Sequence, residues 1–385
     1  MTPAKNVEER VPSFIRRRIL PIVFGVALIV GVIILATLIL LRRPKNDKQQ
    51  LVNRFFASSP ECFHAPPVPG DRRRDKSQLK IANFNAEWLF LYGGRGGIRC
   101  PAESCPWSTT SEALRHLSEV ADMIAKIDAD IVHLSEVEDC RVLETLIQLI
   151  PGDHGYRPYL VTGKDHATGQ NVAMLTRVDP YGSLLRTEKR GQYPVPESIC
   201  VRKNDLGTMG ITKHYLAPIK IENGQGKEYD FMFVGLHLLA RPSDKSRCNQ
   251  REGQASVLRD LVKSKTQGGQ YVVMMGDFND YDPHVLGTDG RKPVSAVLPI
   301  LHGSSGSGFS MYNAAGLVPV KDRYSCWFDV NQNCRVDGNK ERVLIDHILL
   351  DSRLNVKEAK FHHDYNPTCN DRISDHWPFS VTIKL

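Results

Sequence analysis

Residues 271 to 282, YVVMMGDFNDYD, contain the most informative pattern of the chain. A run of β-branched and apolar residues ends at Gly276, and Asp277, Asn279 and Asp280 follow within four positions. The short apolar run predicts a buried strand, and carboxylate and amide oxygens at its end are ligands that hard cations prefer. A strand that ends in Gly-Asp also begins many ordinary turns. The stretch therefore indicates either a metal-binding strand end or a plain strand-turn junction.

The composition is that of a globular protein whose positive charge lies at one end. The 385 residues are 41% hydrophobic and 24% charged, and the formal net charge is +7. Residues 1 to 80 contain 15 Lys and Arg against 6 Asp and Glu, whereas the remaining 305 residues contain 35 against 37. The larger part has no bulk positive charge that would attract nucleic acid by itself. Binding of a polyanion there requires a local patch or a metal ion.

Residues 20 to 41 are 22 consecutive residues without a charge. About 20 apolar residues span a bilayer as a helix, whereas a cleaved signal peptide has a shorter apolar region followed by small residues. We therefore expect a basic N-terminal tail over residues 1–19, a transmembrane signal-anchor helix over 20–41, a juxtamembrane linker over 42–78 and a folded domain over 79–385.

Nine cysteines all follow residue 60, and two pairs are close in sequence, Cys100 with Cys105 and Cys326 with Cys334. This spacing suits short disulfide loops, although the odd count leaves the connectivity open. The alternative is a set of free thiols in a cytosolic enzyme. The absence of a Cys-x-x-Cys pair argues against a structural zinc site.

The orientation across the membrane is predicted from the cysteines rather than from charge. Basic residues are nearly balanced on the two sides of residues 20–41, so the positive-inside rule does not decide. The clustered cysteines favour a catalytic domain in a lumen or outside the cell. The single glycosylation sequon, Asn366-Pro367-Thr368, is disabled by its proline and adds no support.

From Leu79 onward, short apolar runs alternate with helical periodicities, which is typical of an α/β domain. Strands are expected at LKIANFN (79–85), DIVHLSE (130–136), NVAMLTR (171–177), YDFMFVGLHLL (229–239), YVVMMGD (271–277), RVLIDHILLD (342–351) and WPFSVTIKL (377–385). Helices are expected over residues 114–127, 143–150 and 255–262. Thr109 and Glu112 form a capping-box pattern before the first of them.

Several of these strands end in a residue that can bind a metal ion or transfer a proton. These residues are Asn85, Glu87, Glu136, His237, Asp277, Asn279, Asp346, His347 and, just before the last strand, Asp375 and His376. A buried carboxylate or imidazole is costly unless another group compensates it. One such residue alone is more often a cap, a salt bridge or a satisfied core histidine. Their recurrence at strand ends predicts that they share one site.

Seven motifs occur in the order FNAEW, LSEVED, NVAML, GLH, GDFND, IDHIL and SDHWP. Together they resemble the signature set of the endonuclease/exonuclease/phosphatase superfamily, and the resemblance covers residues 79 to 385. It implies an α/β fold, a four-layer α/β sandwich of two packed mixed β-sheets flanked by helices, here preceded by one transmembrane helix. It also implies a phosphoric-ester hydrolase that depends on Mg²⁺, with Mn²⁺ as an alternative.

The resemblance implies a role for each matching residue. The metal ligands would be Glu136, Glu87 and Asp375. The residues that face the substrate phosphate would be Asn85, Asn171 and Asn279. The catalytic residues would be Asp277 and Asn279, which handle the attacking water, His376, which Asp346 holds against the phosphate, and His237, the second histidine at the scissile group. Asp280 is interpreted as a turn residue.

Departures from the patterns of subfamilies narrow the substrate. GDFNDYD differs from the GDxNxR pattern of inositol polyphosphate 5-phosphatases, and His347 stands where secreted deoxyribonucleases have arginine. We favour a membrane-anchored nuclease, an endonuclease or exonuclease, with nucleic acid as substrate. A sphingomyelinase-like phosphodiesterase acting on a phospholipid is the alternative enzyme, and a non-catalytic binding module on the same scaffold is the alternative class.

One segment lacks a counterpart in the resemblance. Residues 329–341, DVNQNCRVDGNKE, have acidic and amide residues at a spacing like that of a calcium loop. Lys340 stands at the twelfth position, where such a loop requires a carboxylate. A polar surface loop is therefore the preferred interpretation.

Overall fold

The quoted apolar run forms strand β9 (Tyr271–Asp277), which lies inside a five-stranded sheet. β9 runs parallel to β8 (Glu228–His237) and antiparallel to β13 (Asp346–Asp351). His237 pairs with Asp277 in one ladder and Asp346 pairs with Asp277 in the other. Three of the predicted site residues therefore meet at one end of this sheet.

The structure is a computed structural model that describes residues 61–91, 106–202, 204–303, 307–365, 367–369 and 373–385. The expected basic tail and transmembrane helix, residues 1–41, lie outside these ranges, and so do Cys100 and Cys105. Within the described ranges, no helix combines the length and the apolar character that crossing a bilayer requires.

Two mixed sheets form the centre of the domain. The five-stranded sheet has the order β10 (Met311–Asn313), β13, β9, β8 and β7 (Lys213–Glu222). The six-stranded sheet has the order β14 (Asn355–Phe361), β15 (Phe379–Lys384), β1 (Gln78–Leu89), β2 (Ile131–Val137), β4 (Asn171–Thr176) and β3 (Arg157–Leu160). Within it, β1 is parallel to β2 and antiparallel to β15. The expectation of two mixed sheets is confirmed.

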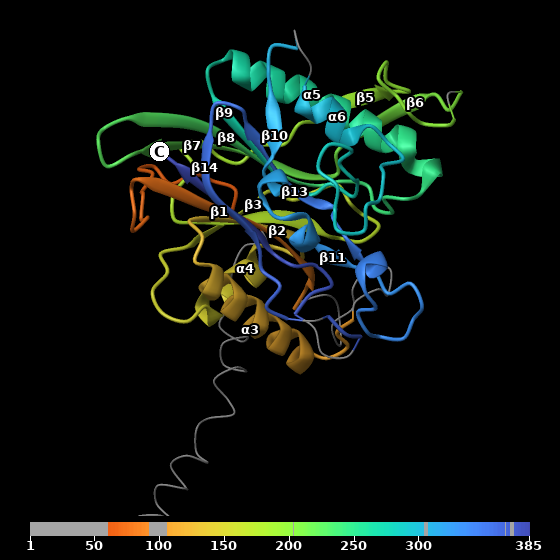
Figure 1. The fold of residues 1–385 in the computed structure, drawn as a ribbon. Helices are drawn as coiled ribbons and strands as arrows, with labels where there is room; N and C mark the ends of the chain where they lie inside the picture. Colours follow the sequence, from red (N-terminus) through yellow and green to blue (C-terminus); the bar gives the residue numbers. More distant parts are fainter. Residues whose placement is uncertain (1–60, 92–105, 203, 304–306, 366, 370–372) are drawn as a thin grey trace, which may run out of the picture. The chain divides into compact units, whose positions relative to one another are not determined.

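Helices cover the outer face of each sheet (Figure 1). α3 (Thr110–Ile127) and α4 (Cys140–Leu149) pack on the six-stranded sheet, and α5 (Cys248–Gln267) and α6 (Val297–His302) pack on the five-stranded sheet. The predicted capping box of α3 is present, because the Thr109 side chain accepts from the Glu112 N–H and the Glu112 carboxylate accepts from the Thr109 N–H. The layers of the predicted α/β sandwich are therefore in place.

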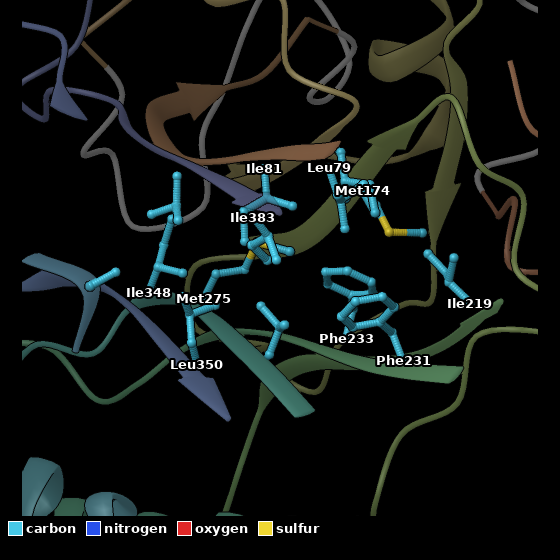
Figure 2. Packing of buried hydrophobic residues seen from close by; sticks show 14 of the residues in the cluster. Leu79, Ile81, Met174, Ile219, Phe231, Phe233, Met275, Ile348, Leu350 and Ile383 are labelled. Atoms are coloured by element: carbon cyan, nitrogen blue, oxygen red, sulfur yellow. The ribbon is translucent and has the colours of Figure 1, made fainter. Parts of the chain in front are cut away.

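The main hydrophobic core lies between the two sheets (Figure 2). Leu79 and Ile81 reach it from β1, and Phe231 and Phe233 reach it from β8. Both pairs are separated by two positions, as side chains on one face of a strand must be. The alternate residues of β8 and β9 pack against α5 and α6 in a second core. Burial on both faces explains why β9 is a continuous apolar run.

One expected strand, residues 342–351, is divided into two. β12 (Arg342–Val343) pairs with β11 (Cys326–Trp327), whereas β13 begins only at Asp346. The reason is Ser325, whose Oγ accepts the N–H groups of Ile345 and Asp346 at 3.1 and 3.0 Å. These two N–H groups are thus satisfied by a side chain in place of a ladder.

The remaining regular elements are short. β5 (Arg190–Tyr193) and β6 (Gly207–Gly210) form a separate hairpin-like pair. Four 3₁₀ turns occur at Lys245–Arg247, Ala314–Leu317, Val320–Asp322 and Asn339–Glu341 among the described residues.

The second half of the expected linker 42–78 belongs to the folded domain. Cys62 forms a disulfide with Cys140 and exchanges backbone hydrogen bonds with Leu160. Arg72 forms a bidentate ion pair with Asp179, with both N···O distances at 2.7 Å. The prolines and charges that suggested a linker are thus explained by an extended segment that packs along the domain surface.

The disulfides differ from the pairs that the sequence spacing suggested. Cys62 bonds Cys140, Cys200 bonds Cys248, and Cys334 bonds Cys369. The expected pairing of Cys326 with Cys334 is wrong, because Cys326 lies buried in β11 as a free thiol. The three bridges join segments 35 to 78 residues apart, and their spatial proximity depends on the fold and not on sequence spacing.

Opening the Cys62–Cys140 bridge is expected to destabilise the domain by about 4 kcal/mol, because the bridge closes a long loop in the unfolded chain. The change is C62S/C140S, and the measurement is the free energy of unfolding in denaturant under non-reducing conditions. Ser352→Ala, at an exposed serine in the turn after β13, serves as a control for a substitution outside any bridge. An unchanged midpoint in the double variant would contradict the bridge.

Candidate active site

The predicted residues come together where strand ends of both sheets meet. β1 and β2 provide Asn85 and Glu136 from the six-stranded sheet, and β8, β9 and β13 provide His237, Asp277 and Asp346 from the five-stranded sheet. The amide of Asn85 connects the two sets, because its Nδ2 lies 3.3 Å from Glu136 Oε1 and 3.3 Å from Asp277 Oδ2. The strand ends therefore build one polar site.

His376 and Asp346 form a buried pair in this site. His376 Nδ1 lies 2.6 Å from Asp346 Oδ2, and His376 Nε2 lies 3.4 Å from Asn85 Nδ2. Burial lowers the pKa of His376, but the Asp346 carboxylate outweighs it and holds the pKa well above its usual value. The Asp346 carboxylate therefore favours the protonated form of the imidazole, whose Nε2 faces the site.

Asp346 is held in turn by its own neighbours. Its main-chain N–H donates to Ser325 Oγ, and its Oδ1 accepts from Asn83 Nδ2 at 3.2 Å. Asn83 is fully buried on β1 and also donates to the Gly276 carbonyl at 3.3 Å. It therefore bridges the two sheets beneath the site. Sequence reasoning missed Asn83, although it lies two positions before Asn85 and thus on the same strand face.

Asp277 lies at the end of β9, between the strands that provide His237 and Asp346. Burial, followed by repulsion from Asp346, raises its pKa. Its Oδ1 accepts the Asn279 N–H at 2.8 Å, and its Oδ2 lies 3.6 Å from His237 Nε2. Gly276 is required before it, because a Cβ there would lie 1.8 Å from the Leu236 carbonyl oxygen.

His237 is a neutral imidazole at this site. Burial, followed by the positive charges of Lys213 and His376, holds its pKa well below the usual value. The pKa values of the two histidines in this site are thus shifted in opposite directions, because only His376 has a carboxylate in hydrogen-bond contact.

Three further carboxylates lie on the other side of Asn85. Glu136 Oε2 accepts the Trp88 N–H at 3.1 Å, and Glu87 Oε2 accepts the Asp375 N–H at 3.0 Å. Burial, followed by the charge of Asp375, raises the pKa of Glu136. An all-oxygen ligand set of this kind would suit Mg²⁺ or Mn²⁺. Among the described residues, however, the ligand atoms at this site that lie within 4.8 Å of one another belong to Asp277, Asp346 and His376. The assignment of Glu136, Glu87 and Asp375 as metal ligands stays a prediction.

Backbone strain is concentrated at the same place. Glu87, Trp88, Glu136 and Asn279 have positive φ angles of 44°, 49°, 64° and 48°. L-residues other than glycine rarely adopt this region, and each costs of order 1 kcal/mol or more. Strain of this kind is retained where a site must aim its side chains.

A cavity of about 480 Å³ opens over these residues. Its polar lining residues include Glu136, His237, Asp277, Asn279 and His376. Its lining also includes Pro242, Tyr281, Cys326, Phe328, Val343 and Ile345. The cavity therefore combines charged groups with apolar surface.

Asn171 lies outside the lining of this cavity. Its Nδ2 donates to the Glu138 carbonyl at 2.7 Å, and its Oδ1 accepts the Gly163 N–H at 2.6 Å. The side chain ties two loops together at the start of β4. Its expected contact with phosphate stays a prediction.

Asp280 and His347 are not the exposed residues that a turn would contain. Asp280 is fully buried, and burial raises its pKa to about 7. Its carboxylate accepts from Ser295 Oγ at 2.7 Å, and its carbonyl oxygen lies 3.0 Å from His347 Nε2. Asp280 does lie in the bend that follows β9, as interpreted, and its buried carboxylate also anchors the segment behind the site.

The segment 329–341 folds on itself through its polar side chains. The Asp337 carboxylate accepts from the amides of Asn331 and Asn333, and the Asp329 carboxylate accepts the Asn333 and Cys334 N–H groups. The acidic and amide side chains of this segment thus form hydrogen bonds within the segment itself, as the interpretation as a polar surface loop expects.

Comparison with solved structures finds related folds at low identity. Truncated TDP2 from Caenorhabditis elegans is 17% identical, with 81% of this chain and 99% of that chain covered, and the TM-score is 0.46. The catalytic domain of Xenopus laevis APE2 is 17% identical, with 80% and 92% covered and a TM-score of 0.49. A mannosyl-6-phosphatase from Bacteroides thetaiotaomicron is 15% identical, with 80% and 100% covered and a TM-score of 0.45. No curated protein sequence matches the chain significantly.

The family assignment rests on a match of another kind. The Endonuclease/Exonuclease/phosphatase family model matches residues 82–376, most of the chain. The matched range begins in β1 and ends at His376, so it includes Asn85, Glu136 and Asp277. The chain therefore belongs to the endonuclease/exonuclease/phosphatase family.

Proposed function

We propose that this protein is a metal-dependent phosphodiester hydrolase and that its substrate is a nucleic acid. The observation that carries the proposal is the position of Asn85 Nδ2, which lies within 3.4 Å of Glu136, Asp277 and His376. The carboxylates of Glu136 and Asp277 and the imidazole of His376 thus surround one point. Members of the family are typically hydrolases of phosphoesters, which supports this reaction class.

The metal would be held by Glu136, with Glu87 and Asp375 beside it. A bound Mg²⁺ or Mn²⁺ supplies charge neutralisation to a phosphoryl oxygen. The mutual repulsion of Glu136 and Asp375 supports the assignment, because a cation would relieve it.

Each remaining polar residue has a proposed task. Asp277, whose pKa is raised, takes a proton from the attacking water, and Asn279 orients the same water or the phosphate. His376, as an imidazolium, donates a proton to the phosphate or to the leaving oxygen. His237 is neutral and donates a hydrogen bond to the scissile group. Asn85 and Asn171 are proposed to bind phosphate oxygens.

The intact polar set also bears on the alternatives. A non-catalytic binding module has no need of a raised Asp277 pKa beside a histidine cation, so an enzyme is favoured. A lipid phosphodiesterase is the second candidate. The observation in its favour is Phe328, a 61% exposed aromatic residue on the cavity wall, followed by exposed Val330.

We also propose that residues 20–41 anchor the protein in a membrane and that the catalytic domain faces a lumen or the cell exterior. Three disulfides among the described cysteines support this orientation, because such bridges persist in oxidising compartments.

The substrate is tested by parallel assays of the full chain, purified in detergent, on plasmid DNA, RNA and sphingomyelin with Mg²⁺. The expected result is the fastest turnover on a nucleic acid, with loss of activity when a chelator is added. Faster turnover of sphingomyelin would favour the lipid phosphodiesterase, and no turnover of any ester would favour the binding module.

Asn83→Ala is expected to lower kcat about tenfold, because the substitution removes one hydrogen bond to the Asp346 carboxylate. Asn83→Asp is expected to lower kcat further, since it places a second carboxylate against Asp346. Steady-state kinetics and thermal unfolding of both variants check this. Wild-type kcat in Asn83→Asp would contradict the role of Asn83 as a positioning residue.

A further inference from the structure

The first turns of α5 are polar on their buried side. Arg251 is 0% exposed and is the largest fully buried side chain of the described residues. Its guanidinium donates to neutral groups: Nη1 to the Arg241 carbonyl at 2.8 Å, Nη2 to the Pro242 carbonyl at 3.0 Å and to the Asp244 carbonyl at 3.4 Å. A buried arginine usually requires a carboxylate partner. Here three carbonyls of one loop take that place.

This loop forms a wall of the candidate active site. Residues 240–244, which connect β8 to the turn before α5, all line the cavity that contains Asp277 and His376. Arg241 is exposed and has a φ of 71°, a conformation that arginine seldom adopts. The bond from Arg251 to the Arg241 carbonyl therefore holds the loop at the strained residue itself.

Arg251 also connects this loop to the GDFND segment. Its Nε donates to Ser295 Oγ at 3.1 Å, and Ser295 Oγ donates to the Asp280 carboxylate at 2.7 Å. Asp280 lies between Asn279 and Tyr281, and both of these line the cavity. A chain of three buried side chains thus fixes the distance between the loop 240–244 and the GDFND segment.

The charges of the loop identify the kind of group that it can bind. Asp244 accepts from Ser246 Oγ at 2.6 Å and faces Arg247 at 3.7 Å, so its negative charge is matched within the same segment. Arg241 therefore gives the loop a positive charge at the cavity. In a substrate with more than one phosphate, a phosphate next to the scissile bond would contact this positive charge.

We propose that Arg241 binds a phosphate of the substrate chain next to the scissile one and that Arg251 is the positioning residue that holds Arg241 in place. The inference rests on the proposed phosphodiesterase function and deepens it, because it assigns a polyanionic substrate. It also explains why an arginine is buried here although burying its charge costs free energy. An apolar residue would stabilise the fold equally but could not donate hydrogen bonds to the three loop carbonyls.

The test compares KM with kcat for two substrates in the full chain: a single-stranded oligonucleotide and the small ester bis(p-nitrophenyl) phosphate. Arg241→Ala is expected to raise KM for the oligonucleotide about 10- to 100-fold, and to affect the small ester far less. Lys245→Ala removes an exposed positive charge outside the cavity lining and is the matched control, with an expected KM close to that of the wild type. Equal KM for the oligonucleotide in Arg241→Ala and the wild type would overturn the proposal.

Arg251→Ala separates positioning from mere stabilisation. We expect the same rise in KM, reversal by added guanidinium ion but not by ammonium ion, and no further rise in R241A/R251A. An equal loss of kcat/KM for both substrates, with no recovery on addition of guanidinium, would overturn the role of Arg251 as a positioning residue. If Arg251→Ala does not fold, Arg251→Lys is measured, with an expected intermediate KM.

The same variants are also tested for oligonucleotide binding in chelator, where hydrolysis is absent. Weaker binding by Arg241→Ala supports the proposal even if the wild type shows no turnover. Absence of turnover in the wild type would refute the phosphodiesterase function alone, whereas wild-type binding by Arg241→Ala would refute this inference alone.

Discussion

Replacing His376 with alanine is expected to lower kcat/KM for an oligonucleotide about 10³-fold, because the site loses its buried proton donor. His376 Nδ1 lies 2.6 Å from Asp346 Oδ2, and this carboxylate keeps the imidazole protonated. The leaving oxygen of a nucleotide is an alkoxide, which needs a proton as it departs. The loss should therefore fall on kcat rather than on KM.

The leaving group gives a sharper check of the same variant. p-Nitrophenolate leaves without a proton, so His376→Ala should lose much less activity on bis(p-nitrophenyl) phosphate than on the oligonucleotide. His166→Ala, at an exposed histidine outside the cavity lining, is the control and should retain activity on both. Equal losses on the two substrates would show that His376 acts through charge or structure and not as a proton donor.

Glu136→Gln is the second change with a large expected effect. The variant keeps the shape of the side chain and removes the charge of one of the three proposed metal ligands, the others being Glu87 and Asp375. We expect weaker Mn²⁺ binding, measured by electron paramagnetic resonance, and a loss of at least about 10²-fold in kcat at saturating substrate and low Mg²⁺. Part of the loss should be recovered as Mg²⁺ is raised.

The control for Glu136→Gln is Glu228→Gln, which removes an exposed carboxylate at the opposite end of β8 from His237. This variant should bind Mn²⁺ like the wild type. Unchanged Mn²⁺ binding in Glu136→Gln would refute the assignment of Glu136 as a metal ligand.

The strand ends were predictable because a buried strand has a simple pattern. The run before Asp277 is apolar on both faces, and β9 has the predicted bounds. Parallel pairing of β8 with β9 then places His237 beside Asp277, and antiparallel pairing of β13 adds Asp346. The local pattern was enough to predict the strand ends and, from their recurrence, a shared site, whereas the pairing that brings His237, Asp277 and Asp346 together is seen only in the structure.

Contacts between distant segments were not predictable in this way. Asn83 donates a hydrogen bond to Asp346, which is 263 residues away in sequence. Arg251 donates to main-chain carbonyls of the loop 240–244, and every residue has such a carbonyl, so the sequence pattern does not indicate this contact. The same limit applies to Cys334, whose partner Cys369 comes close only after the chain has folded. β7 and β14 were also missed. β14 is an edge strand with mainly exposed side chains, and its residues show no apolar run.

The central claim is that the strand ends around Asn85 form one metal-dependent phosphodiesterase site. Its most direct test is hydrolysis of bis(p-nitrophenyl) phosphate by the full chain, followed by the absorbance of the released p-nitrophenolate. The rate is measured first with Mg²⁺, then with chelator, and then with Mg²⁺ restored. We predict turnover that chelator abolishes and Mg²⁺ restores. Turnover that persists in chelator would contradict the claim, and so would the absence of turnover in a folded protein that holds Mg²⁺.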